Sequence, residues 1–151
     1  NDIPLIRQWN RLLSTAVCMK ELKMGNGSTC RSYQITNYIC PLQAFVTEHS
    51  MTTSPELIEE YLQTLPVHDG ESEPRYNLFA WNDPVRGFTV VYLPREKHRP
   101  ACYTATGKDQ LLVSPGALDM AGLLVTPRKE DFDKITEQDI LQIYNEVAYH
   151  N

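Results

Sequence analysis

The sequence predicts an α+β fold in which antiparallel strands pack against a few helices. Residues 76–81 and 88–93 are apolar strand segments, joined by a short turn of Asn, Asp, Pro, Val, Arg and Gly. Two well-capped helices are expected to begin after Ser54 and after Thr136. With 151 residues and 42% hydrophobic content, the chain is also large enough to bury a core. Because no linker divides it, we expect residues 1–151 to form a single domain.

The first part of the chain contains two different apolar patterns. In residues 5–13 the apolar side chains recur at helical spacing, whereas in residues 17–22 they alternate as in a strand. The type of this segment therefore stays open between helix and strand. The Gly-Asn-Gly-Ser run at residues 25–28 predicts a turn, because Gly and Asn accept positive φ at little cost. Such a turn closes a hairpin if residues 33–46 are extended chain. We expect this extended chain to be broken at Cys40-Pro41, because proline has no N–H to donate to a neighbouring strand.

The first strongly predicted helix has Ser54 as its N-cap and Pro55 at its first position. Glu56 follows near the positive end of the helix dipole, and Pro66 ends the pattern. One apolar stripe is expected on this helix, formed by Leu57, Ile58, Tyr61, Leu62 and Leu65. Residues 68–74 then predict a solvated loop.

The second half of the chain predicts more strands and one further helix. Residues 76–81 and 88–93 are apolar on both faces, which is typical of central strands in a covered sheet. Residues 111–113 are expected to be extended and residues 120–126 to form a strand. The last helix has Thr136 as N-cap, with Asp139 three residues on as a weaker capping box. Its buried stripe is predicted to be Ile140, Leu141, Ile143, Tyr144 and Val147.

The charge and hydropathy of the chain exclude several classes of partner. A net charge of −5 argues against a broad footprint for nucleic acid or for an anionic membrane. No apolar run approaches the roughly 20 residues that a membrane-spanning helix requires. The chain begins at Asn1 rather than a methionine and shows no signal-peptide pattern, so we expect the true amino terminus to lie further upstream.

The cysteines and histidines give no metal or disulfide pattern. The cysteines lack C-x-x-C spacing, which favours reduced thiols in a cytoplasm over structural bridges: Cys18, Cys30, Cys40 and Cys102. The histidines have no Cys or His partner two to four residues away: His49, His68, His98 and His150. We therefore predict neither a metal nor a cofactor. For Cys40 and Cys102, a buried inert thiol is favoured over a nucleophile, which would require a neighbouring base.

The densest polar feature is a basic run between two prolines, directly after a predicted strand. Four basic side chains lie in it, namely Arg95, Lys97, His98 and Arg99. Rigid flanks and planar guanidinium groups suit a phosphate or pyrophosphate, which requires geometry as well as charge. The alternative is a solvated sheet edge whose charges prevent pairing with another strand.

Two further charged positions allow more than one interpretation. The run from Arg128 to Asp131 is interpreted as a mixed-sign turn before the last helix, in preference to a binding site. Asp119 is interpreted as a residue that caps a turn by accepting backbone hydrogen bonds. The other interpretation of Asp119 is that it holds a buried arginine, either Arg128 or Arg95.

Standard catalytic motifs are absent from this sequence. It contains no H-x-H, no G-x-S-x-G, no G-x-x-x-x-G-K-[ST] and no H-E-x-x-H. No catalytic residue is therefore assigned.

A series of short motifs does resemble a known family. In order along the chain they are Tyr76-Asn77-Leu78, Leu93-Pro94-Arg95, Ser114-Pro115-Gly116, Asp119, Ala121-Gly122 and Arg128-Lys129-Glu130-Asp131-Phe132. This order resembles the carboxy-terminal part of the GDP-hexose phosphorylases, including the plant GDP-L-galactose phosphorylases and related uncharacterised bacterial proteins. They form a branch of the histidine-triad and hexose-1-phosphate uridylyltransferase superfamily. The resemblance covers about residues 33–147.

The resemblance implies a histidine-triad-like antiparallel sheet and a ping-pong transfer through a nucleotidylated histidine of an H-x-H-x-Q motif. That motif would lie upstream of this chain. Asn77, Arg95 and Arg128 stand at positions equivalent to those of the family motifs. Leu123 replaces a histidine that is frequent in the phosphorylases, and Ser114 replaces an asparagine, so GDP-galactose itself is not inferred as substrate.

The resulting hypothesis is that the chain is the carboxy-terminal half of a nucleotidyltransferase or nucleotide-sugar phosphorylase-like protein. It would shape a sugar-nucleotide or phosphate pocket, lack the nucleophile and be inactive alone. The expected ligand contacts are Asn77, Arg95, Lys97, His98, Arg99 and Arg128. Expected partners are a nucleotide sugar or phosphorylated small molecule, the missing amino-terminal half, and a second copy in a homodimer. The alternatives are a non-catalytic binding or assembly module and, third, a stand-alone hydrolase that uses a cysteine.

Overall fold

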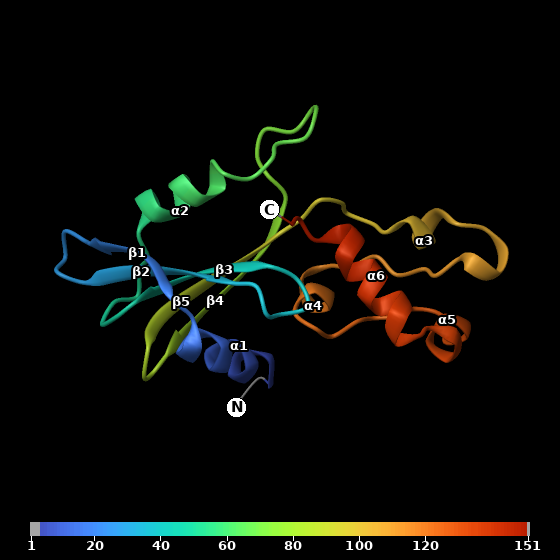
Figure 1. Ribbon diagram of the computed structural model, residues 1–151, viewed down its shortest axis with the longest axis horizontal. Helices are drawn as coiled ribbons and strands as arrows, with labels where there is room; N and C mark the ends of the chain where they lie inside the picture. Colours follow the sequence, from blue (N-terminus) through green and yellow to red (C-terminus); the bar gives the residue numbers. More distant parts are fainter. Residues whose placement is uncertain (1–3, 151) are drawn as a thin grey trace.

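A five-stranded antiparallel sheet with helices on both faces forms the larger part of the protein (Figure 1). The computed structural model describes residues 4–150. The strand order is β1-β2-β3-β5-β4, and each neighbouring pair is antiparallel. The strands are β1 Cys18–Lys23, β2 Thr29–Ile35, β3 Leu42–Thr47, β4 Tyr76–Asp83 and β5 Gly87–Pro94. The predicted α+β class with an antiparallel sheet is therefore confirmed.

The ambiguous first segment contains both of the elements that its patterns suggested. Helix α1 spans Pro4–Thr15, and β1 follows after a two-residue connection. The predicted turn joins β1 to β2, with the Met24 N–H donating to the Ser28 carbonyl at 2.8 Å. Each pattern was therefore correct over its own residues.

Helix α2, Pro55–Leu62, begins as the sequence predicts. The Ser54 hydroxyl accepts a hydrogen bond from the Leu57 N–H at 3.3 Å, and Pro55 opens the first turn. The helix ends at Leu62, before Pro66, and Leu65 is buried in the turn that follows.

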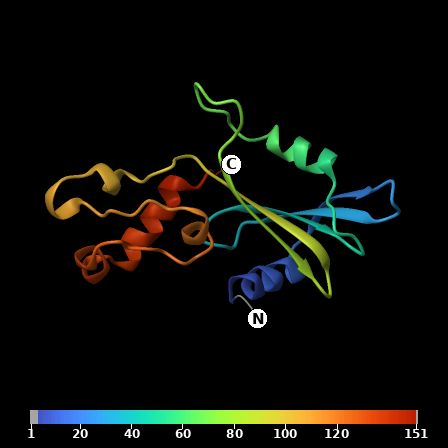
Figure 2. The same cartoon turned by 180° about the vertical axis from the view of Figure 1, so that it is seen from behind.

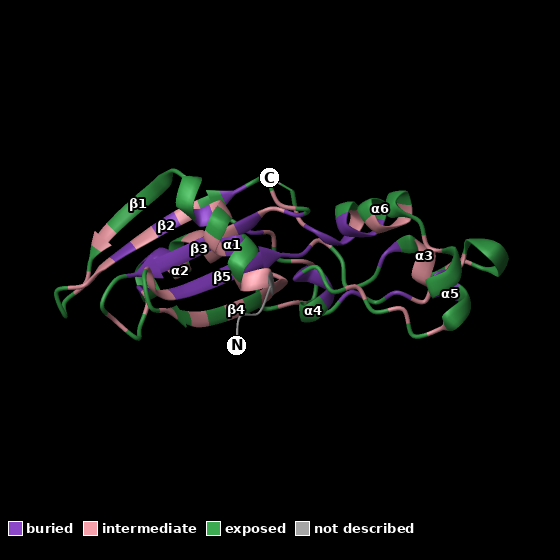
Figure 3. Ribbon diagram, turned by 90° about the horizontal axis from the view of Figure 1, so that it is seen from below, coloured by how far each residue is buried: buried purple, intermediate pink, exposed green. Residues whose placement is uncertain are grey.

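The two faces of the sheet bury separate sets of side chains. Helix α2 covers one face, where Leu57 and Tyr61 pack against Phe45, Val90 and Tyr92. Helix α1 covers the other face, where Trp9 and Leu13 are buried (Figure 3). The purple centre of the sheet in Figure 3 consists mainly of β3 and β5.

The hairpin of β4 and β5 is present, but only β5 is central. Strand β4 is at the edge of the sheet, and Leu78 on it is 46% exposed. The prediction of two central strands is therefore wrong for β4, because this strand is last in the strand order and one of its faces is only partly covered. Gly87 starts β5 with a φ of 104°, and an added Cβ there would lie 2.3 Å from the Thr47 carbonyl oxygen. Only glycine fits this position.

Residues 95–148, which we call the C-terminal arm, extend from one end of the sheet (Figures 1 and 2). The arm contains α3 Ala101–Thr104, a 3-10 turn Gly107–Asp109, α4 Ala117–Met120, α5 Lys129–Lys134 and α6 Glu137–Val147. It starts and ends at the same place, because Arg95 forms a β-bridge with Ala148 and the Tyr149 N–H donates to the Pro94 carbonyl at 3.1 Å.

The strand predicted for residues 120–126 does not exist. Helix α4 ends at Met120, and the chain then turns through Gly122, whose φ is 97°. The Leu123 N–H donates to the Leu118 carbonyl at 3.0 Å, which folds the segment back instead of extending it. Residues 111–113 are also outside the sheet.

Helix α6 has the predicted capping box. The Asp139 N–H donates to the Thr136 hydroxyl at 3.2 Å, and the Thr136 N–H donates to the Asp139 carboxylate at 2.8 Å. Ile143, Tyr144 and Val147 are buried as expected. Leu141 is 52% exposed, so its assignment to the buried stripe is wrong. No helix among the described residues is long and apolar enough to cross a membrane.

Candidate functional site

The basic run after β5 is organised around one buried side chain, Arg95. Its five N–H donors all have acceptors inside the protein. The acceptors are the carbonyls of Lys97, His98 and Pro115 and the side-chain oxygen of Asn77, at 2.8–3.2 Å. The Arg95 residue is only 6% exposed, and this burial lowers the pKa of its guanidinium from the ordinary value. Arg95 therefore has no donor left for a ligand in this arrangement.

The hydrogen bonds of Arg95 hold the backbone of the loop that carries the other basic residues. We call residues 95–99 the basic loop. The Glu96 N–H also donates to the Val147 carbonyl at 2.9 Å, which ties the loop to the end of α6. Through Pro115, Arg95 fixes the Ser114-Pro115-Gly116 turn beside the same loop. Two motifs that are distant in sequence therefore form one rigid unit.

The remaining basic residues of the loop are exposed. Arg99 lies 4.3 Å above the ring of Tyr103, and its Nε donates to the Ser114 hydroxyl at 3.2 Å. The Nε2 atom of His98 is 4.0 Å from a Glu71 carboxylate oxygen. Lys97 is also exposed at the tip of the loop. The basic loop thus presents three cationic or titratable groups to solvent from a fixed backbone.

A hollow of about 530 Å³ lies beside Arg95 and brings together Asn77, Arg95 and His98. Its wall also contains Glu71 and Arg75, which the sequence analysis did not identify. Arg75 holds Glu71 through hydrogen bonds of 2.7–3.0 Å from Nε and Nη2, and this partner lowers the pKa of the Glu71 carboxyl. The one sequence signal for this pair was its spacing of four residues, with Glu71 in the predicted loop and Arg75 directly after it.

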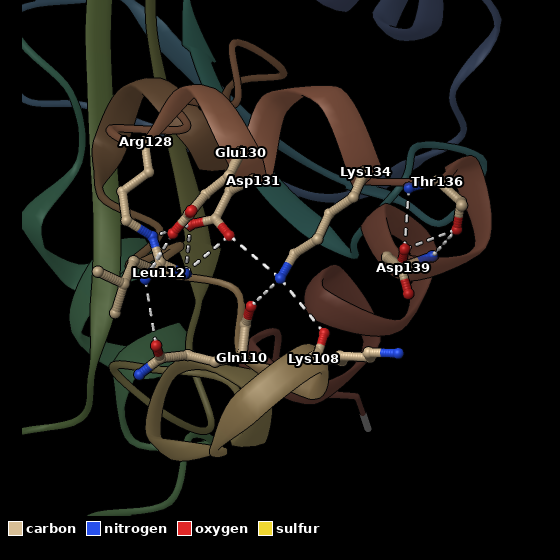
Figure 4. Close-up of polar contacts among 9 residues, drawn as sticks. All are labelled: Lys108, Gln110, Leu112, Arg128, Glu130, Asp131, Lys134, Thr136 and Asp139. Atoms are coloured by element: carbon tan, nitrogen blue, oxygen red, sulfur yellow. Dashed lines mark hydrogen bonds and ion pairs between the residues drawn. The ribbon is translucent and has the colours of Figure 1, made fainter.

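Arg128 is not part of this hollow but of a second polar cluster at α5 (Figure 4). Its Nε and Nη2 atoms donate to the two carboxylate oxygens of Asp131 at 2.7 and 2.8 Å. Asp131 also accepts from the Leu112 N–H at 3.0 Å, and Lys134 donates to the Gln110 carbonyl at 2.5 Å. We call Arg128, Asp131 and Lys134 the α5 clamp, because they hold residues 108–112 against the helix.

Asp131 is the centre of the clamp, and its side chain is fully covered. The hydrogen bonds from Arg128 are the largest influence on it and lower the pKa of its carboxyl to about 2. The run from Arg128 to Asp131 is therefore the start of a helix with a covered ion pair, and not the exposed turn that we expected.

Asp119 has the turn-capping role that was favoured for it. Its carboxylate accepts from the Gly116 N–H at 2.9 Å and from the Val125 N–H at 2.7 Å. No ion pair joins Asp119 to Arg95 or Arg128 among residues 4–150, and both arginines bond elsewhere. The pairing of Asp119 with a buried arginine is therefore wrong.

The four cysteines are free thiols of very different exposure. Cys40 is 1% exposed, and burial raises the pKa of its thiol to about 12. Burial also raises the pKa of Cys102, to which nearby Glu146 contributes. Both shifts oppose thiolate formation. The part of the chain that the structure describes contains no grouping of three metal-ligating side chains.

Thiol reactivity at pH 8 is expected to follow this order of exposure. Cys18 is exposed and should be alkylated first by iodoacetamide, and the half-covered Cys102 more slowly. Cys30 and Cys40 should be alkylated only after unfolding. Peptide-resolved mass spectrometry measures the four rates, and Cys18→Ser should remove the fast phase. Alkylation of Cys40 in the native protein at the rate of Cys18 would contradict the buried position.

Comparison with known proteins identifies the family of this chain. No curated protein and no solved structure matches the chain. The family described as "GDPGP1-like, C-terminal domain" matches residues 14–151, which is most of the chain and includes the sheet, the basic loop and the C-terminal arm. The chain belongs to this family and is the C-terminal domain of a GDP-hexose phosphorylase-like protein.

Proposed function

We propose that this chain forms one side of a nucleotide-sugar or sugar-phosphate pocket, and that the basic loop contacts the phosphates. The observation that carries this proposal is the full occupation of the Arg95 donors inside the protein. A buried arginine that fixes its own loop leaves the neighbouring cations pre-positioned for an anion.

Within this proposal the predicted site residues have different roles. Lys97, His98 and Arg99 are the contact residues, because they are exposed on the fixed loop. Arg99 bonds Ser114 through its Nε, which leaves its Nη donors to bind phosphate oxygens. Asn77 and Arg95 are positioning residues. Arg128, in the α5 clamp, is assigned a structural role instead of ligand contact.

The chemical step is proposed to belong to a preceding part of the same protein. A ping-pong nucleotidyl transfer requires a neutral imidazole aimed at the α-phosphate. Here His98, the histidine of the basic loop, is exposed and faces the Glu71 carboxylate. We therefore place the nucleophilic histidine, in an H-x-H-x-Q motif, upstream of Asn1, and assign residues 1–151 as a single domain that is inactive alone.

The resemblance also supports a histidine-triad-like sheet as the origin of this domain. Four free thiols, one of them exposed, fit a reducing compartment such as the cytoplasm.

Binding of nucleotide sugars should depend on Lys97 and Arg99. In the full-length protein, Arg99→Ala is expected to weaken binding of a GDP-hexose by about tenfold, and Lys97→Ala by a smaller factor. Affinity should also fall as salt rises, because the contacts are charge-based and solvent-accessible. Isothermal titration calorimetry with GDP- and UDP-sugars measures both effects.

Lys129→Ala is the matched control, since this side chain is 85% exposed and lies on α5, away from the basic loop. The proposal fails if Arg99→Ala and Lys129→Ala bind nucleotide sugars with the same affinity. A full-length protein that binds no nucleotide sugar at all would favour a non-catalytic assembly module.

A further inference from the structure

The C-terminal arm contributes to the core of the sheet, has a small buried cluster of its own and exposes other large apolar side chains. Its own buried cluster consists of Leu111, Val113 and Ile143. Three large apolar residues around α4 are exposed, with Leu118 at 60%, Leu123 at 63% and Val125 at 52%. We call these three residues the α4 patch.

Hydrogen bonds hold the backbone of the α4 patch in place. The Leu123 N–H donates to the Leu118 carbonyl at 3.0 Å, and the Val125 N–H donates to the Asp119 carboxylate at 2.7 Å. Between them, Met120 is fully buried in the core of the sheet. The three apolar side chains therefore stand on a fixed turn and are not mobile loop residues. Rigid, clustered apolar exposure of this kind is typical of a protein interface.

The position of α1 shows at which end of the sheet this helix begins. Asn10, in the middle of α1, donates to Asp83 at 2.7 Å, at the last residue of β4. Trp9 packs on Phe79 and Trp81. The first turn of α1 therefore points toward the opposite end of β4, where Asn77 and α4 lie (Figures 1 and 3). Helix α1 therefore begins at the end of the sheet from which the C-terminal arm extends, and a domain that precedes this chain is connected at that end.

The turn that precedes α4 is also bonded to the basic loop. Arg95 donates to the Pro115 carbonyl at 2.8 Å, two residues before α4 begins. Ser114, in the same turn, accepts from Arg99. A body that docks on the α4 patch would thus lie next to the cations of the basic loop.

We infer that the α4 patch is the docking surface for the domain that precedes this chain in the same polypeptide. The inference rests on the proposed function, in which that domain carries the nucleotidyl-transferring histidine. Docking there buries Leu118, Leu123 and Val125 and closes the ligand pocket between the two domains. The chain's side of the pocket is the basic loop.

Photo-crosslinking in the full-length protein tests which body covers the patch. A benzoylphenylalanine at position 123 is expected to form an intramolecular crosslink to peptides upstream of Asn1. The matched control is position 85, because Val85 is 91% exposed in the β4–β5 turn, at the opposite end of the sheet. A crosslink that doubles the mass would show that a second copy covers the patch, and it would overturn the inference. An absence of crosslinks above the position 85 control would overturn it as well.

A second measurement uses the double variant Leu118→Ser/Leu123→Ser in the full-length protein. Amide hydrogen exchange in residues 117–126 is expected to become at least about tenfold faster, because an interface no longer covers them. Val85→Ser should leave that exchange unchanged. Unchanged exchange in the double variant would contradict docking at this surface.

The two proposals can fail separately. If Arg99→Ala reduces nucleotide-sugar affinity but no crosslink to the upstream domain forms, the pocket stands and the docking surface is wrong. If the crosslink forms and Arg99→Ala binds normally, the docking surface stands and the basic loop is not the phosphate site.

Discussion

Trp9→Ala is expected to lower the free energy of unfolding by about 3–5 kcal/mol, the range for removing a large buried aromatic side chain. Trp9 is fully buried, and its ring contacts Tyr38, Phe79 and Trp81 at centroid distances of 5.1–6.0 Å. It is the main residue through which α1 covers its face of the sheet. Loss of the indole would leave a cavity between α1 and β4 that the rigid strands cannot fill. Urea denaturation followed by circular dichroism measures the change.

Two variants make the result specific to burial. Arg11→Ala, on the exposed side of the same helix, is expected to change stability little. Trp9→Phe should cost less than Trp9→Ala, because it keeps an aromatic ring and removes a buried indole N–H that has no hydrogen-bond partner among residues 4–150. If Trp9→Ala and Arg11→Ala were equally stable, α1 would not be docked as described.

Asp131→Ala is expected to lower the free energy of unfolding by about 1.5–3 kcal/mol, the range for hydrogen bonds to a charged group. The variant removes the acceptor for the Leu112 N–H and the partner of Arg128 and Lys134. The greatest effect should be on residues 108–112, which Asp131 and Lys134 hold. Hydrogen exchange of this segment and urea denaturation measure the local and the global effect.

Asp133→Ala is the matched control, because it lies on the same helix but is 54% exposed and pairs only with Lys129 among the described residues. We expect it to be nearly neutral. If Asp133→Ala lost as much stability as Asp131→Ala, the total charge of α5 and not the clamp would determine the stability of this region.

The clamp also predicts a pH dependence. The pKa of Asp131 is lowered to about 2 in the folded protein, compared with about 4 for an unperturbed Asp. A group with a lowered folded pKa stabilises the protein above its unfolded pKa, and this contribution is lost as pH falls from about 4 toward 2. The stability difference between wild type and Asp131→Ala should therefore shrink over that interval. A difference that stays constant down to pH 2 would contradict an ionised Asp131 in the clamp.

Local sequence signals predicted most of the sheet and the starts of α2 and α6. Ser54 and Thr136 form the caps that their residue types suggested, and the Gly-Asn-Gly-Ser turn joins two paired strands. These features depend on contacts within a few residues, so a single sequence contains the information. The interior of the arm depends on longer contacts. Residues 120–126 look like an apolar strand, but Asp119 and Gly122 fold them into a turn around the buried Met120.

The candidate site shows the same limit. Sequence reasoning identified the basic run but could not tell which of its cations is buried. Arg95 is buried because Asn77 and the Pro115 carbonyl, 18 and 20 residues away, supply acceptors for its guanidinium. Arg128 was grouped with it by motif order, yet its partner is Asp131, three residues later. Only the three-dimensional arrangement separates these two arginines.

The meeting of both ends of the C-terminal arm at Arg95 and Ala148 has an evolutionary consequence. The arm leaves and rejoins the sheet at one point, and between its ends α4 and α6 pack on the core of the sheet, so the segments that connect these two helices can change in length without altering any strand pairing. Relatives can therefore inherit a constant scaffold and diversify these segments, and we expect insertions, deletions and changes of ligand preference within the family to concentrate between Arg95 and Ala148.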